Sequence, residues 1–198
     1  EAPVAAAFER ALRTLAARGA RIAEIALPEI AEVSELFEGG GFSAAESYAW
    51  HRERLAARGD RYDPRVALRI RRGETMSAAT YLGLHARRAR WITRMAAAMA
   101  GFDAMLSPTV PLVAPPMAPL LPGSAEADER FFAVNALLLR NPSVVNQLDG
   151  CAISLPCQAA GELPVGLMLW AGALADDTVL DAALAIEAAL DGARREGR

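Results

Sequence analysis

The sequence predicts an α/β protein in which a mixed β-sheet is flanked by helices on both faces. Two segments near the C-terminus, 151–157 and 165–170, are apolar on both faces, as strands buried inside a sheet are. Segments with helical spacing of apolar residues precede and follow them, so helices are available to cover the sheet. With 198 residues, of which 53% are hydrophobic, the chain suits one domain or a little more, with a large core.

The first 27 residues predict a helix followed by a strand. Apolar residues recur at helical spacing over 3–18, Pro3 suits the first turn, and Gly19 suits the stop. Over 20–27 the apolar residues alternate with polar ones, which is the period of a strand. A helix followed by a strand is the order expected of an α/β sandwich.

Residues 29–100 are predicted to be helical in three pieces. The first, 29–58, is bent or interrupted at the glycines 39–41, and a short helix follows over 64–73. The third covers 77–100, with Ser77 as its N-cap. Apolar residues three and four apart form one stripe along it, and the histidine in this stripe is expected to be buried with one hydrogen-bond partner rather than to act as a base. The stripe comprises Leu82, His85, Ala89, Ile92, Ala96 and Met99.

A proline-rich connection separates the next strand from the next helix. A short buried strand over 104–106 ends at Ser107-Pro108. Six prolines between 108 and 122 exclude a helix or a central strand there, because proline lacks the backbone donor. A helix over 126–139 is expected to break at Asn141-Pro142.

The last part of the chain predicts a hairpin and a helix. The strands 151–157 and 165–170 are close enough in sequence to pair antiparallel, and Gly166 permits close approach of a neighbouring backbone. A final helix covers 176–191, with its inward side marked by Val179, Ala183, Ile186 and Leu190.

Composition excludes several classes of function. All 21 basic residues are arginine, the formal net charge is −3, and we expect no nucleic-acid partner. The arginines 87, 88, 90 and 94 are interpreted as a solvated face rather than a site for phosphate or an acidic substrate.

Cys151 and Cys157 lie roughly 20 Å apart along one strand, too far for a disulfide. Free thiols, no signal-peptide pattern and no long apolar run predict a cytoplasmic protein without a membrane partner. Two histidines without a Cys/His cluster predict no zinc site, and no paired glycine motif marks a nucleotide site, so no cofactor is expected.

Two stretches in the second half resemble the amidase signature family. "FDAMLSPTVPLVAPP" over 102–116 is similar to the family's strand and proline-rich turn, and the segment 145–187, with "AISLP" and "LPVGL", is similar to its closing block. The resemblance implies a mixed sheet with helices on both faces, and hydrolysis of a carboxylic amide without a cofactor by a nucleophilic serine, a second serine on a cis peptide, and a lysine.

The resemblance also implies that this chain, 1–198, is the C-terminal portion of a single amidase signature domain. The chain contains no lysine and nothing that matches the family's Gly/Ser-rich loop, so the catalytic residues are expected to lie outside it. Four residues are candidates for walling the substrate cleft: Thr109, Asn146, Asp149 and Cys151. Asn146 and Asp149 would bind substrate or cap the turn before the strand, and capping is favoured. Cys151 is expected to be inert, as a buried thiol is.

Three functions remain open on the sequence. The first is an amidase that acts on a small-molecule amide and whose catalytic segment is not in this chain. The second is the A subunit of the glutamyl-tRNA(Gln) amidotransferase, which requires partner subunits and a route for ammonia. The third is a non-catalytic binding or scaffolding protein. A sheet without its neighbouring strands would expose apolar edges, so we expect a homo-oligomer or association with the missing half.

Overall fold

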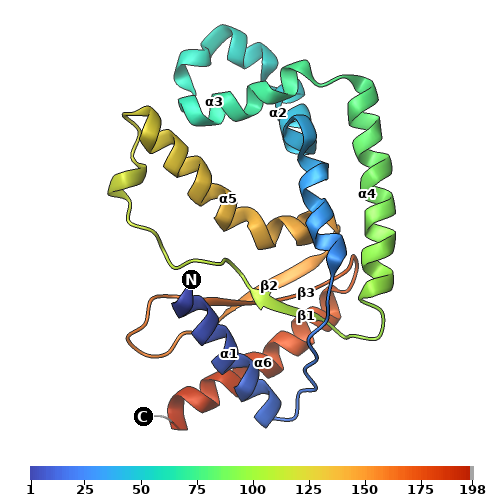
Figure 1. The fold of residues 1–198 in the computed structure, drawn as a ribbon, viewed down its shortest axis with the longest axis vertical. Helices are drawn as coiled ribbons and strands as arrows, with labels where there is room; N and C mark the ends of the chain where they lie inside the picture. The colour runs from blue at the N-terminus through green and yellow to red at the C-terminus, as the bar shows by residue number, and fades with distance from the viewer. Residues whose placement is uncertain (197–198) are drawn as a thin grey trace. The chain divides into compact units, whose positions relative to one another are not determined.

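The computed structural model describes residues 1–196, and side chains as far as residue 193. The chain divides into two compact units (Figure 1). The sheet unit comprises Glu1–Ala26 together with the chain from Met99 onward, and the helical unit comprises Leu27–Ala98. Among the described residues no helix is long and apolar enough to cross a membrane.

Three strands form the sheet of the sheet unit. They are β1 (Met105–Pro108), β2 (Cys151–Pro156) and β3 (Gly166–Ala171), in the order β1-β3-β2. β3 pairs antiparallel with both neighbours, which confirms the predicted hairpin of β2 and β3. The mixed character expected of the sheet is not seen among these three strands. β3 is buried on both faces as predicted, whereas β2 alternates between partly buried and exposed residues because it lies at an edge.

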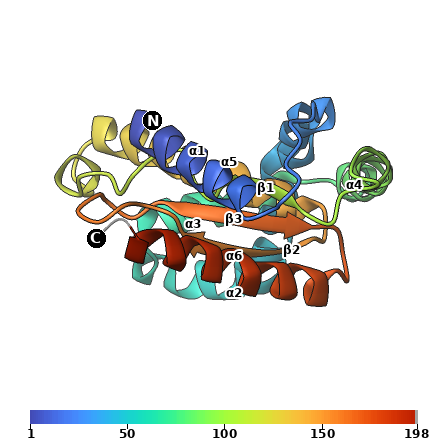
Figure 2. The ribbon, with the colours of Figure 1, turned by 90° about the horizontal axis from the view of Figure 1, so that it is seen from below.

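Helices cover both faces of this sheet, as the sequence predicts. α1 (Ala2–Ala17) and α6 (Asp176–Glu196) lie beside each other on one face, and α5 (Ala125–Gln147) lies on the opposite side of the strands (Figures 1 and 2). Leu167, Leu169 and Ala171 are two residues apart and so point to the face that α1 and α6 cover. Val179, Ala183 and Leu190 are buried on α6, and Ile186 packs against them, which confirms the predicted inward side.

α5 does not break at Asn141-Pro142, so that prediction was wrong. The helix continues through Pro142 to Gln147. A proline inside a helix costs roughly 3 kcal/mol, because one hydrogen bond is lost and the ring meets the preceding turn. The turn beyond Pro142 carries Val144 and Val145, both buried, and each buried aliphatic side chain contributes roughly 1.5–3 kcal/mol. Tertiary packing therefore offsets the local cost.

The strand predicted over 20–27 is absent. The segment is irregular, and Ile22, one of its alternating apolar residues, is 39% exposed. Alternation supplies the side-chain period of a strand but not a neighbouring strand to receive its backbone hydrogen bonds, and none of the described strands pairs with it.

The helical unit contains the three predicted helical pieces and additional short helices. A 3₁₀ helix, η1 (Pro28–Gly40), precedes α2 (Gly41–Arg58), and the predicted interruption at the glycines is confirmed by non-helical backbone at Glu38 and Gly39. The remaining helices are η2 (Gly59–Arg61), α3 (Pro64–Arg71), η3 (Arg72–Thr75) and α4 (Ala78–Ala98).

Side-chain caps begin the last two α-helices of this unit. Asp63 accepts hydrogen bonds from the backbone N–H groups of Arg65 and Val66 at the start of α3. Ser77 Oγ accepts one from Thr80 N at 3.0 Å, so the predicted N-cap of α4 is confirmed.

The prediction of which face of α4 is buried was wrong. The buried residues are Leu84, Trp91 and Met95, whereas His85 is exposed and makes edge-to-face contacts with the rings of Phe42 and Tyr81. α4 is rich in alanine, so apolar residues occur on more than one side, and periodicity alone could not choose between them. The choice is made by the bulk of Trp91, whose side chain packs inward at 2% exposure.

Candidate functional site

Hydroxyl groups from two strands meet at one end of the sheet. Thr109 directly follows β1, and its N–H donates to Gly166 O of β3 at 2.8 Å. Thr109 Oγ1 and Ser154 Oγ, from β2, are 2.5 Å apart in a hydrogen bond. Gly166 lies between them, and a Cβ there would be 2.4 Å from both oxygens. The pair of hydroxyls therefore depends on glycine at position 166.

Ser107 and Asn141 complete this arrangement, which we call the strand-end cluster: Ser107, Thr109, Asn141, Ser154 and Gly166. Ser107 precedes Thr109 by two residues, and its Oγ is buried with no hydrogen-bond partner in the part of the chain that the structure describes. Asn141 Nδ2, from α5, donates to Pro108 O at 2.7 Å. This bond fixes α5 against the end of β1.

The strand-end cluster suits binding rather than proton transfer. Serine and threonine hydroxyls each offer one donor and two acceptor positions, and none of the five residues ionises near neutral pH. The Thr109–Ser154 bond uses one of the two hydroxyl protons and leaves the other, together with that of Ser107. Such groups complement the C=O and N–H of an amide. They lack the base that would activate a serine as a nucleophile.

The other three residues singled out in the sequence lie at the opposite end of β2. Asn146 is exposed in the last turn of α5, and Asp149 is in the following turn with φ 55°. Cys151 opens β2 opposite Ala171, and its Sγ donates to Gly172 O at 3.5 Å. Since each strand residue advances roughly 3.3 Å, this turn is well separated from Thr109. The structure therefore places the four candidates in two places rather than one.

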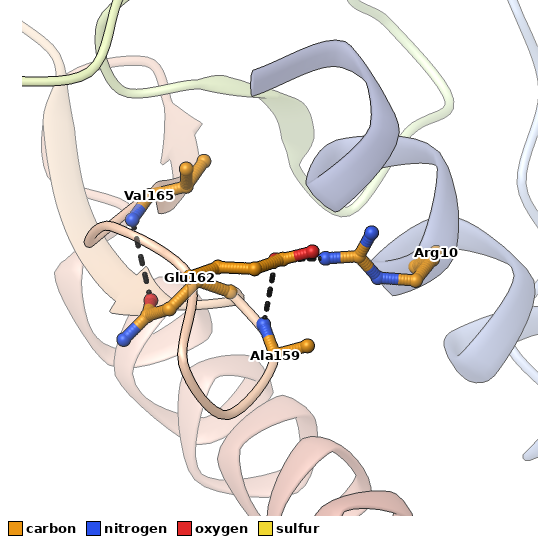
Figure 3. A network of polar contacts seen from close by, with 5 residues as sticks. Arg10, Ala159, Glu162 and Val165 are labelled. Carbon is orange, nitrogen blue, oxygen red and sulfur yellow. Dashed lines mark hydrogen bonds and ion pairs between the residues drawn. The ribbon is translucent and has the colours of Figure 1, made fainter. Parts of the chain in front are cut away.

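The loop that joins β2 to β3 lies at the same end of the hairpin as the strand-end cluster. Gln158 Oε1 accepts from Val165 N at 3.2 Å, and the Glu162 carboxylate accepts from Ala159 N at 2.9 Å (Figure 3). Glu162 also forms an ion pair with Arg10 of α1. The Ala159 N–H, and then Arg10, lower the pKa of the Glu162 carboxyl below its usual value. The ionised glutamate thus ties the loop to α1.

Sequence reasoning found Thr109 but missed Ser107, Asn141 and Ser154. The spacing of two between Ser107 and Thr109 is a signal that both share one face of a strand. The predicted close approach at Gly166 is present, but the neighbours are side-chain hydroxyls rather than backbone. Asn141 was assigned to a helix break, and its contact with β1 is set by tertiary structure.

Comparisons with known proteins place these features in context. The family model described as "Amidase" matches residues 1–180. The chain is 32% identical over 186 residues to the 2-amino-5-chloromuconic acid deaminase of Comamonas testosteroni, covering 93% of this chain and 39% of that protein. It is 30% identical over 214 residues to the A subunit of the glutamyl-tRNA(Gln) amidotransferase of Salinispora arenicola, covering 96% and 42%. The chain thus spans about two fifths of these relatives.

Solved structures share the fold. An allophanate hydrolase of Kluyveromyces lactis superposes with a TM-score of 0.80 at 22% identity, covering 96% of this chain and 30% of that one. A crystal structure described as an amidase gives a TM-score of 0.69 at 25% identity, covering 89% and 39%.

Proposed function

The chain belongs to the amidase family, and on this premise we propose that the protein containing it hydrolyses a carboxylic amide bond. Residues 1–198 are proposed to be the C-terminal portion of a single amidase signature domain within this parent protein. The length comparison supports this, since the chain spans about two fifths of its curated relatives. The parent is proposed to act on a small-molecule amide, with no nucleic-acid or membrane partner.

In the proposed chemistry the catalytic residues belong to the rest of the parent, and this chain contributes to substrate binding. A lysine, acting through a serine on a cis peptide, would remove the proton of a nucleophilic serine, which attacks the amide carbon. The chain has no lysine, so this triad must lie outside residues 1–198. The contribution of the chain is then to bind and orient the substrate, which lowers the barrier by holding the reacting atoms in place.

The strand-end cluster is the observation that carries this assignment. Its hydroxyls have hydrogen-bonding capacity left over at the exposed Thr109–Ser154 pair, and Ser107 Oγ is buried beside them without a partner among the described residues. The Thr109–Ser154 pair is exposed, so a substrate amide could form hydrogen bonds with these two hydroxyls.

A kinetic comparison of parent-protein variants tests the proposal. We expect the parent to release ammonium or amine from members of a panel of small amides, and Thr109→Val to lower kcat/KM about tenfold, since one hydrogen bond to substrate is lost without a change of shape. Thr178→Val, an exposed position on α6, is the matched control and should leave kcat/KM unchanged. No turnover with any amide, or equal kcat/KM in both variants, would contradict the assignment.

A second candidate is the A subunit of the glutamyl-tRNA(Gln) amidotransferase, favoured by the 30% identity to the Salinispora arenicola protein. This function predicts that the parent co-purifies with partner subunits and transfers ammonia to an acyl group instead of releasing it to water. A non-catalytic binding protein is the third candidate, and it predicts amide binding without turnover.

The edges of the sheet support a further proposal about association. β1 and β2 are the outer strands of the described sheet, so each presents one row of backbone N–H and C=O groups that β3 does not receive. We propose that these edges pair with the rest of the parent or with a second copy. Light scattering of the isolated chain should therefore show species larger than a monomer, and a clean monomer would count against this.

A further inference from the structure

A pocket of about 140 Å³ lies in the helical unit between η1 and α4. Its lining differs in chemistry from the strand-end cluster, because most of the lining side chains are charged and none carries a hydroxyl. The lining residues are Glu32, Glu35 and Leu36 from η1, and Arg87, Arg90, Trp91 and Arg94 from α4.

Much of this lining is held in place by contacts within the helical unit. Arg94 forms an ion pair with Glu32, and Arg87 forms one with Glu38. Trp91 Nε1 donates to Glu29 O at 2.7 Å, which fixes the indole between the two helices. A pocket whose walls are already ordered loses little entropy when a ligand binds.

Two oppositely charged side chains in the lining have no ion-pair partner among the described residues. Among the described residues, neither Arg90 nor Glu35 has an ion pair or a side-chain hydrogen bond, and they are not paired with each other. The lining therefore offers one cation and one anion.

We propose that this pocket binds a small α-amino acid as its zwitterion. The carboxylate would pair with Arg90, and the ammonium would pair with Glu35. A simple anion would leave Glu35 as a repulsive charge in the pocket, and a simple cation would leave Arg90 as one. The volume has room for several water molecules and hence for a small solute of this kind. The inference goes beyond the proposed function, since it requires no amide hydrolysis.

Ligand binding to the parent protein, measured at low ionic strength and neutral pH, tests the inference. L-Alanine is the probe, and propionate and ethylammonium each reproduce one of its two charges. We expect L-alanine to bind at least about tenfold more tightly than either, since it forms both charge-assisted contacts. Titration calorimetry or ligand-observed NMR reports the affinities.

Variants place the binding at this pocket. Arg90→Gln and Glu35→Gln should each weaken L-alanine binding about tenfold or more, and both side chains are exposed, so melting temperatures should not change. The matched controls Arg54→Gln and Glu53→Gln remove exposed charges of α2 and should leave the affinity unchanged.

Three results would overturn the proposal. L-Alanine that fails to bind at tens of millimolar, or that binds Arg90→Gln as well as the unaltered protein, contradicts a site here. Propionate that binds as tightly as L-alanine, with Glu35→Gln inert, shows a simple anion site instead. Amidase activity is not used in this experiment, so its outcome is separate from that of the proposed function.

Discussion

The sheet unit and the helical unit are stabilised in different ways. In the sheet unit the central strand β3 is buried along its length, and Leu167 and Leu169 pack against α1 and α6. The helical unit combines a smaller apolar core with polar cross-links and close backbone contacts. Examples are the Trp91 hydrogen bond to Glu29 O, and the approach of Gly73 to the backbone of Ala44.

This difference separates two sources of stability. Burial of apolar area is non-directional, so the core between β3 and the helices α1 and α6 should respond mainly to loss of side-chain volume. Close contacts and hydrogen bonds depend on position, so the helical unit should respond to small additions of volume. Substitutions chosen for each unit therefore test this difference.

The largest effect is expected from Leu167→Ala in β3. Leu167 is fully buried, and removing its isopropyl group leaves a cavity between β3 and α1. The loss should be about 2–5 kcal/mol in the free energy of unfolding, measured by calorimetry or denaturant titration of the parent protein. Leu184→Ala, at a leucine that is 68% exposed on α6, should change it by less than about 0.5 kcal/mol. Equal losses at both positions would contradict the assignment of the core.

A smaller effect is expected from Gly73→Ala in the helical unit. The added Cβ would lie 2.1 Å from Ala44 O, which is backbone and can move only with α2. Overpacking of this kind costs about 1–3 kcal/mol. Gly83→Ala in α4 is the control, because no atom lies within 4 Å of its Cβ position and alanine stabilises a helix by about 0.5–1 kcal/mol over glycine. The melting temperature should fall for the first variant and rise for the second.

The smallest effect is expected at the loop between β2 and β3. Glu162→Gln weakens the contacts with Ala159 N and Arg10, so hydrogen exchange of the loop peptide should speed up while global stability is nearly unchanged. The folded-state pKa of Glu162 is lowered, so its stabilising contribution is present above the usual glutamate pKa of 4.5 and is lost as pH falls through the folded-state value. After correction for intrinsic exchange, protection in this loop should therefore decrease in acid.

A surface pair on α1 provides the control for the loop prediction. Glu9→Gln removes the exposed Glu9–Arg13 pair and should not alter exchange at Ala159. Equal exchange in Glu162→Gln and the unaltered protein would show that the glutamate does not hold the loop.

The sequence predicted parts of both units, and the errors in each have physical reasons. The hairpin and the inward side of α6 follow from dense apolar patterns that permit one arrangement. On α4 several faces carry alanine, so the buried side depended on where Trp91 packs. The helix through Pro142 and the irregular segment 20–27 were missed because tertiary packing and the availability of a partner strand decide them.

The candidate site was predictable only in part. Thr109 stands out in a recognisable proline-rich phrase, and Gly166 is a glycine inside a buried strand. The contact between Thr109 and Ser154 spans 45 positions in the sequence and depends on strand register, which local patterns do not specify. Arg90 and Glu35 could not be singled out from the sequence, because it does not show that the neighbouring charges, Arg87 and Arg94, form ion pairs with other residues.

The proposal that the catalytic residues lie outside residues 1–198 is tested most directly by comparing the activities of this chain and its parent. The purified chain 1–198 and the parent protein would be assayed side by side for amide hydrolysis with the same panel of small amides. We predict turnover by the parent and none by the isolated chain, because the chain contains no lysine to serve the proposed catalytic triad. Amide hydrolysis by the isolated chain would contradict it.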